Sequence, residues 1–211
     1  SPDLSSSYLA FNNTIPPLNN KKLREALSIV INRDNFTKFV TGRNEKPLYD
    51  IVPYGFNNYT PYIPSWAKLS EKELLEKAQK LYKEAGYSKE NPATIKFSYV
   101  TNETDRKYAT ALASIWEKAL GVKTELISEE WKVHLSYLVA KKYEVTMQLW
   151  KADYNDAENF IGLLETGNPQ NITGYNNKSL NEILNKSNKE MNPIKRKALL
   201  LEASKLAMDD F

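Results

Sequence analysis

The stretch that decides the fold covers residues 93–150 and reads ATIKFSYVTNETDRKYATALASIWEKALGVKTELISEEWKVHLSYLVAKKYEVTMQLW. Three short runs in it, rich in β-branched and aromatic residues, predict strands: 93–100, 122–130 and 143–150. Two runs between them, with apolar residues at helical spacing, predict helices: 104–120 and 131–142. Strands that alternate with helices indicate a mainly parallel sheet flanked by helices, so the expected fold class is α/β.

The segments on either side of this stretch extend the same pattern. Residues 6–13 alternate and predict a strand, and 21–40 begins with helical spacing. The proline-rich and aromatic segment 41–69 predicts a long ordered loop. Ser70 and Glu73 form a capping box that opens a helix, and Gly86 suits its end. Three further helical segments complete the chain: 158–167, 179–191 and 192–208.

Composition limits the classes of function. The 211 residues are 41% hydrophobic, which is enough for one domain over residues 1–211. A net charge of +3 gives no electrostatic argument for nucleic acid. The absence of Cys excludes disulfides, thiolate metal sites and thiol catalysis. No apolar run is long enough to cross a membrane. The start at Ser1 and the ending LAMDDF lead us to expect a piece of a longer protein.

The residue types that carry catalysis are sparse. His134 is the single histidine, and at its helical position it is interpreted as a packing or surface residue. Without a second His or a Cys, we expect no transition-metal site, and no nucleophile-elbow motif accompanies His134. Glu129 and Glu130 are neighbours in the chain and point apart, unlike a glycosidase pair. No phosphate-binding glycine motif occurs. We therefore expect no catalytic residue, no cofactor and no enzyme activity.

Aromatic residues mark the ends of two predicted strands. Trp131 directly follows one strand, and Trp150 ends another shortly before Asp153. In an open parallel sheet the crevice that binds ligands lies at the carboxyl ends of the strands. The alternative is structural: both tryptophans cover the sheet edge, and Asp153 caps the next helix. Composition alone leaves both interpretations open, whereas Trp116, in the middle of an amphipathic helix, is assigned to the core.

Four motifs together resemble a known family, and they occur in its order and spacing along nearly the whole chain. They are LREALSIVINRDNF (23–36), AQKLYKEAGY (78–87), IWEKALGVKTELISEEWKVHL (115–135) and WKADYNDAENF (150–160). The sequence resembles the oligopeptide-binding members of the solute-binding proteins of peptide ABC transporters. The resemblance implies the carboxyl-side lobe of a bilobed periplasmic-binding-protein-type fold, with an extended peptide enclosed between two lobes.

The resemblance also implies roles for individual residues. Asp153 matches the acid that receives the α-ammonium group of the peptide. Trp131 and Trp150 match aromatic walls of the side-chain pockets, so both are expected to be exposed in a single lobe. Leu149 and Lys151 lie where the strand exit supplies main-chain contacts.

The sequence departs from the family at the site for the peptide carboxylate. Leu138 and Met147 are apolar where well-studied members carry basic residues, and Asp105 is acidic where they carry a histidine. The preferred peptide length therefore stays open. Either longer peptides bind without a fixed carboxylate site, or one of three lysines compensates: Lys141, Lys142 or Lys151.

The resemblance further implies partners and a location. The expected partners are oligopeptides and the ABC permease subunits of a membrane importer, with a monomeric binding protein in the periplasm or another extracytoplasmic space. A lipid anchor on the full-length protein is left open. Two alternatives remain: a sensory or signalling peptide-binding module without transport, and a relative that binds another solute, such as a metal complex, haem or a sugar.

Overall fold

A four-stranded sheet in the order β1-β4-β2-β3 forms the centre of the fold in the computed structural model, which describes residues 4–42 and 46–211. The strands are β1 (Ser5–Phe11), β2 (Thr94–Val100), β3 (Lys123–Glu129) and β4 (Val145–Lys151). Strand β2 pairs in parallel with both β3 and β4, whereas β1 runs antiparallel to β4. The predicted α/β class with a mainly parallel sheet is therefore confirmed.

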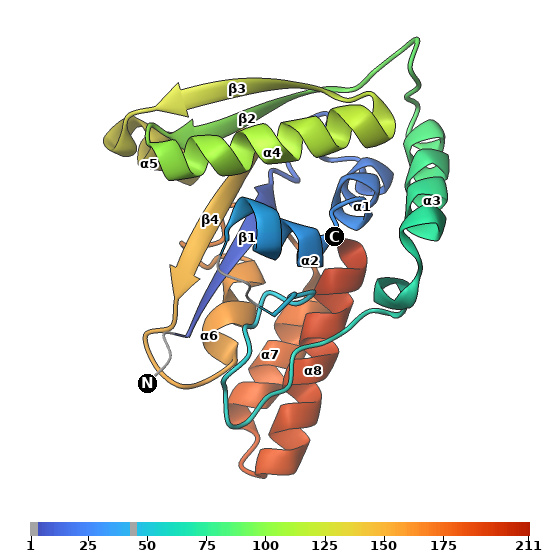
Figure 1. Ribbon diagram of the computed structural model, residues 1–211. Coiled ribbons are helices and arrows are strands. Elements are labelled where there is room, and N and C mark those ends of the chain that lie inside the picture. The colour runs from blue at the N-terminus through green and yellow to red at the C-terminus, as the bar shows by residue number, and fades with distance from the viewer. Residues whose placement is uncertain (1–3, 43–45) are drawn as a thin grey trace.

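Helices surround the sheet (Figure 1). The longer ones are α1 (Lys21–Ile29), α3 (Glu71–Glu84), α4 (Glu103–Leu120), α5 (Trp131–Val139), α7 (Lys178–Lys189) and α8 (Pro193–Asp210). The short ones are α2 (Arg33–Asn35), the π-helix η1 (Phe36–Val40), the 3-10 helix η2 (Ser65–Lys68), α6 (Glu158–Ile161) and the 3-10 helix η3 (Gly162–Leu164). Helices α7 and α8 form a hairpin that extends away from the sheet.

The helical segment 21–40 is not continuous. Helix α1 ends at Ile29, and a new turn begins after Asn32. The Asn32 side chain accepts a hydrogen bond from the backbone N–H of Asn35 at 3.0 Å. An asparagine that caps a new turn in this way competes with continuation of the previous helix. The apolar spacing at the start of 21–40 correctly predicted a helix, but it did not reveal this break.

Helices α4 and α5 cover opposite faces of the sheet. Trp116 of α4 packs in the same core as Phe97 and Val145. On the other face, the His134 imidazole of α5 lies 3.5 Å from the hydroxyl of Thr146. Neighbouring residues on a strand point to opposite faces, so Val145 faces α4 and Thr146 faces α5. A second core joins the segment around Phe56 to helices α6, α7 and α8.

The predicted helix boundaries at residues 70 and 121 have the expected local chemistry. The Ser70 hydroxyl accepts from the Glu73 backbone N–H at 3.2 Å and donates to the Glu73 carboxylate at 3.0 Å. Gly121 closes α4 with φ of 78°, a left-handed conformation that suits glycine. The capping box at the start of α3 is therefore confirmed.

Asp50 organises the proline-rich loop. Its buried carboxylate accepts hydrogen bonds from the Tyr59 hydroxyl at 2.5 Å and the Tyr62 backbone N–H at 2.8 Å. The Ser204 hydroxyl of α8 also donates to it at 2.5 Å, which ties the loop to that helix. The prediction of an ordered loop holds for the described part of 41–69. Residues 43–45 of that segment lie outside the described residues.

We expect the free energy of unfolding to fall as pH rises above about 10. Burial raises the pKa of Tyr8 to about 12 and also raises the pKa values of Tyr59 and Tyr143. These phenols stay neutral in the folded chain while they ionise near pH ~10 in the unfolded chain. The unfolded state then binds fewer protons, so stability is lost with rising pH. Urea unfolding at pH 8 and pH 11 measures the loss.

The Tyr143→Phe variant provides the control for this effect. The phenylalanine removes one ionisable group and the hydrogen bond to the Ile172 carbonyl, 2.8 Å long, while keeping the ring in place. The variant should be less stable at neutral pH but lose less stability between pH 8 and pH 11. Two arginines act in the opposite direction: burial lowers the pKa of Arg33 to about 10 and also lowers the pKa of Arg24. A wild-type stability that is flat or rises over this pH range contradicts the prediction.

Candidate ligand-binding site

The carboxyl ends of β2, β3 and β4 define the candidate site. Because β2 pairs in parallel with β3 and β4, all three strands end toward the same edge of the sheet. Trp131 begins α5 two residues after β3 ends, and Asp153 lies two residues beyond β4. Figure 1 shows the start of α5 and the loop after β4 on the same side of the molecule. This is the edge where open parallel sheets bind ligands.

Asp153 is exposed, and its backbone is fixed by Asn159. The Asp153 N–H donates to Asn159 Oδ1 at 3.1 Å, and the same oxygen accepts the Trp150 Nε1–H at 3.1 Å. Within the described part of the chain, the Asp153 carboxylate makes no hydrogen bond or ion pair. The backbone of Asp153 is therefore fixed, and its carboxylate is free to accept hydrogen bonds from a ligand.

The structural alternative for Asp153 is wrong. Ala157 is the N-cap residue of α6, with no side-chain cap bond, and Asp156 Oδ1 accepts the Glu158 N–H at 3.0 Å. Asp156 also pairs with Arg196, with 2.9 Å between Oδ2 and Nη1. The acid that serves the fold in this loop is therefore Asp156, and Asp153 has no part in capping.

The two tryptophans differ in exposure. Trp131 is 56% exposed and belongs to an apolar outer surface of α5. Trp150 is only partly exposed, because its indole packs against the core formed by α6, α7 and α8 while Asn159 holds its N–H. The expectation that both rings are widely exposed is wrong for Trp150. The further exposed apolar residues of α5 are Val133, Leu135, Tyr137 and Val139.

The other predicted site residues occupy three different environments. Leu149 is 56% exposed and Lys151 is exposed, at the end of β4. Met147 is half-buried on the face of the sheet that carries α4. Leu138 is 3% exposed and packs with Ala10 and Tyr143. Leu138 therefore offers a ligand almost no surface in the described lobe, while contact by the other residues stays a prediction.

Buried polar groups fix the helix that carries Trp131. His134 Nδ1 lies 2.9 Å from Glu129 Oε1, and both side chains are nearly inaccessible. The Glu130 carboxylate accepts from the backbone N–H groups of Lys132 and Val133, at 3.0 and 3.3 Å. The neighbouring glutamates thus point apart as expected, and His134 is a packing residue. The sequence signal for this arrangement was the acidic pair directly before Trp131.

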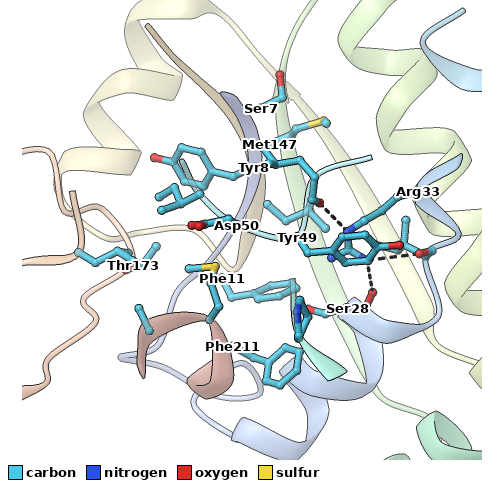
Figure 2. Close-up of a pocket in the computed structure, with 18 of the residues that line it drawn as sticks. Ser7, Tyr8, Phe11, Ser28, Arg33, Tyr49, Asp50, Met147, Thr173 and Phe211 are labelled. Carbon is cyan, nitrogen blue, oxygen red and sulfur yellow. Dashed lines mark hydrogen bonds between the residues drawn. The ribbon is translucent and has the colours of Figure 1, made fainter. Parts of the chain in front are cut away.

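A cavity of about 260 Å³ lies between β1, the loop around Tyr49 and the end of α8 (Figure 2). Its wall includes Arg33, whose guanidinium lies 4.7 Å from the Tyr49 ring centroid and 5.2 Å from that of Trp66. Arg33 Nε donates to the Leu48 carbonyl at 2.9 Å. Among the predicted site residues Met147 lines this cavity. Sequence analysis missed Arg33, and the aromatic character of segment 41–69 was the available signal.

The described residues contain no group of three or more His, Cys, Asp or Glu side chains arranged to hold a metal ion. In the same part of the chain, no helix combines the length and apolar character needed to cross a membrane. The chemistry that the candidate site does offer is a fixed, free carboxylate beside apolar and aromatic surface.

The chain belongs to the bacterial extracellular solute-binding proteins of family 5, whose middle-region model matches residues 1–171. It is 32% identical over 208 residues to the periplasmic murein peptide-binding protein MppA of Escherichia coli, covering 99% of this chain and 39% of that protein. It is 34% identical to the oligopeptide-binding protein OppA of Bacillus subtilis, covering 96% and 38%.

A crystal structure of Haemophilus influenzae OppA in complex with the peptide RPPGFSPFR is similar over 99% of this chain, with a TM-score of 0.94 and 28% identity. The chain covers 41% of that structure. It therefore spans about two fifths of the length of the relatives it matches. The family recognised from the four sequence motifs is confirmed.

Proposed function

We propose that this chain is the carboxyl-side lobe of an extracytoplasmic solute-binding protein that holds oligopeptides between two lobes and delivers them to a membrane permease. The observation that carries the proposal is the free carboxylate of Asp153 on a fixed backbone. Every peptide has an amino terminus, so one fixed acid can set the position of a bound peptide whatever its sequence. A charge-assisted hydrogen bond of this kind contributes roughly 1.5–3 kcal/mol when partly shielded from water.

The surroundings of Asp153 suit a ligand with variable side chains. Trp131 follows β3 and Leu149 lies in β4, and each is 56% exposed and offers apolar surface. Such surface accepts many side chains, particularly when water fills the remaining space. Main-chain hydrogen bonds to an extended peptide supply affinity that does not depend on its sequence. The proposed protein is a monomer with no catalytic step.

Asp153 also separates this proposal from its alternatives. A sugar offers the Asp153 carboxylate only neutral hydroxyl donors, and a haem offers no ammonium group, so the α-ammonium of a peptide is the ligand group that supplies a charge-assisted hydrogen bond. A sensory module would bind the same peptides and would differ in its partner. Co-purification of the full-length protein with permease subunits, rather than with a signalling receptor, distinguishes transport from sensing.

The chain alone should bind peptides only beyond about the millimolar range. In the proposed site the second lobe supplies half of the main-chain partners and excludes water. Without it, an exposed ion pair at Asp153 contributes roughly 0–1 kcal/mol. Calorimetry of this chain with a mixed peptide library measures the affinity, and the full-length protein is the positive control. Micromolar binding by this chain would contradict the two-lobe proposal.

Peptide amides should bind the full-length protein nearly as well as the corresponding free acids. Leu138 is packed in the core and Met147 is apolar, so neither can receive a peptide carboxylate. Competition between a tetrapeptide acid and its amide for the same site gives the ratio of affinities. A strong preference for the free acid would indicate that another basic side chain receives the peptide carboxylate. Lys151 is the first candidate, so Lys151→Met should then abolish the preference.

A further inference from the structure

The turn between α7 and α8 exposes two large apolar side chains. Met191 is 92% exposed and Ile194 is 82% exposed, more than any other large apolar residue of the described chain. The turn is well ordered by hydrogen bonds: Asn192 Oδ1 accepts from the N–H groups of Ile194 and Lys195 at 3.0 and 3.2 Å. The Asn192 N–H donates to Glu190 Oε1 at 3.0 Å. The local structure therefore holds both apolar side chains outward.

The apolar surface continues along α8. Ala198 and Leu201 are exposed, four and seven residues after Ile194. Residues at these spacings share one face of a helix. We call the exposed set formed by Met191, Ile194, Ala198 and Leu201 the hairpin stripe. It faces away from the core that α8 forms through Leu200, Ala203 and Ala207.

Positive charge surrounds the end of the stripe. Four exposed lysines lie within five residues of Met191 or Ile194 and have no ion-pair partner among the described residues: Lys186, Lys189, Lys195 and Lys197. The neighbouring Arg196 is neutralised by Asp156 at 2.9 Å. Glu190 is the acid at the turn, and its carboxylate is engaged by the Asn192 N–H. The tip therefore combines exposed apolar side chains with a local excess of cations.

We infer that this tip is a docking surface for a membrane that carries anionic lipids. Apolar side chains bordered by lysines are the pattern that lies in the interface of such membranes. A lysine near an anionic surface contributes about 1 kcal/mol, which corresponds to about fivefold in partitioning. The hairpin end projects away from the sheet (Figure 1), so it can meet a flat surface.

Docking at the tip is compatible with ligand binding at the other site. In Figure 1 α5 lies at the upper left and the loop after β4 at the lower left, while the end of the hairpin lies at the bottom, beyond that loop. The inference does not depend on which solute the protein binds. Loss of peptide binding through Asp153 and loss of membrane binding through the tip can therefore be measured separately.

Vesicle flotation with this chain tests the inference. Vesicles of phosphatidylglycerol mixed with phosphatidylcholine should carry the chain at low salt, and vesicles of phosphatidylcholine alone should not. The double variant Lys189→Glu and Lys195→Glu should bind the anionic vesicles at least about tenfold less. Met191→Ser with Ile194→Ser should bind several-fold less. The matched control is Lys77→Glu with Lys80→Glu, which makes the same charge change on the exposed face of α3 and should bind nearly as well as the wild type.

Several results would overturn the inference. One is failure of the wild-type chain to bind anionic vesicles at low salt. Equal losses for the α3 and tip lysine variants would reveal adsorption by net charge alone, as would unchanged binding after the Met191 and Ile194 substitutions. Retention on immobilised polyglutamate without vesicle binding would indicate an acidic protein partner instead. Circular dichroism spectra confirm that each variant is folded.

Discussion

Asp153→Asn in the full-length protein should weaken the binding of peptides with a free amino terminus by about tenfold or more. The amide has the size of the carboxylate, so the change removes charge and leaves the packing unaltered. The Asp153 backbone N–H still donates to Asn159, because that bond does not involve the substituted group. A tenfold loss corresponds to about 1.4 kcal/mol, slightly below the range for a charge-assisted hydrogen bond.

Two comparisons make this test specific for the ammonium group. Peptides acetylated at the amino terminus carry no ammonium, so the wild type and Asp153→Asn should bind them with similar affinity. Asp156→Asn is the matched control, because Asp156 lies in the same loop, accepts the Glu158 N–H at the start of α6 and pairs with Arg196. That variant should lower stability and leave the ratio between free and acetylated peptides unchanged. Equal losses for both peptides with Asp153→Asn would contradict the assignment.

Much of the fold was predictable because its determinants are local. The alternation over 93–150 depends on side-chain spacing within each element, and the caps at Ser70 and Gly121 depend on neighbours one turn away. The position of Asp153 followed from the same pattern, since a residue just beyond a parallel strand lies at the carboxyl edge of the sheet. Local chemistry was sufficient for these features.

The features that sequence analysis missed depend on distant contacts. Leu138 is buried because Ala10, far earlier in the chain, lies on the strand that α5 covers. Trp150 is partly buried because Asn159 and the α6 to α8 core receive its ring. In both cases helical or strand spacing gave the correct element and no information about its partner. A resemblance to a family predicts which residues occupy matching positions, but it does not predict how exposed their side chains are.

The largest loss of stability should follow Trp116→Ala. Trp116 is 0% exposed at the centre of the core between α4 and the sheet. Its Nε1–H donates to the Leu27 carbonyl of α1 at 2.9 Å, across 89 residues of sequence. Removing the indole leaves a cavity and an unpaired buried carbonyl, and substitutions of this kind cost about 3–5 kcal/mol. Urea denaturation followed by circular dichroism measures the change in the free energy of unfolding.

Two further variants separate the contributions to this loss. Trp116→Phe keeps an aromatic ring but removes the N–H donor, so it should cost less than the alanine variant while still leaving the Leu27 carbonyl unpaired. Trp131→Ala removes the same side chain from a position that is 56% exposed, and it should change the free energy of unfolding by less than about 1 kcal/mol. In the proposed function Trp131 contacts the ligand, whereas Trp116 lies in the core. The two alanine variants should therefore differ: Trp116→Ala should be unstable with its site residues unchanged, and Trp131→Ala should be stable with weakened ligand binding. A Trp131→Ala variant as unstable as Trp116→Ala would contradict the division of the two tryptophans between site and core.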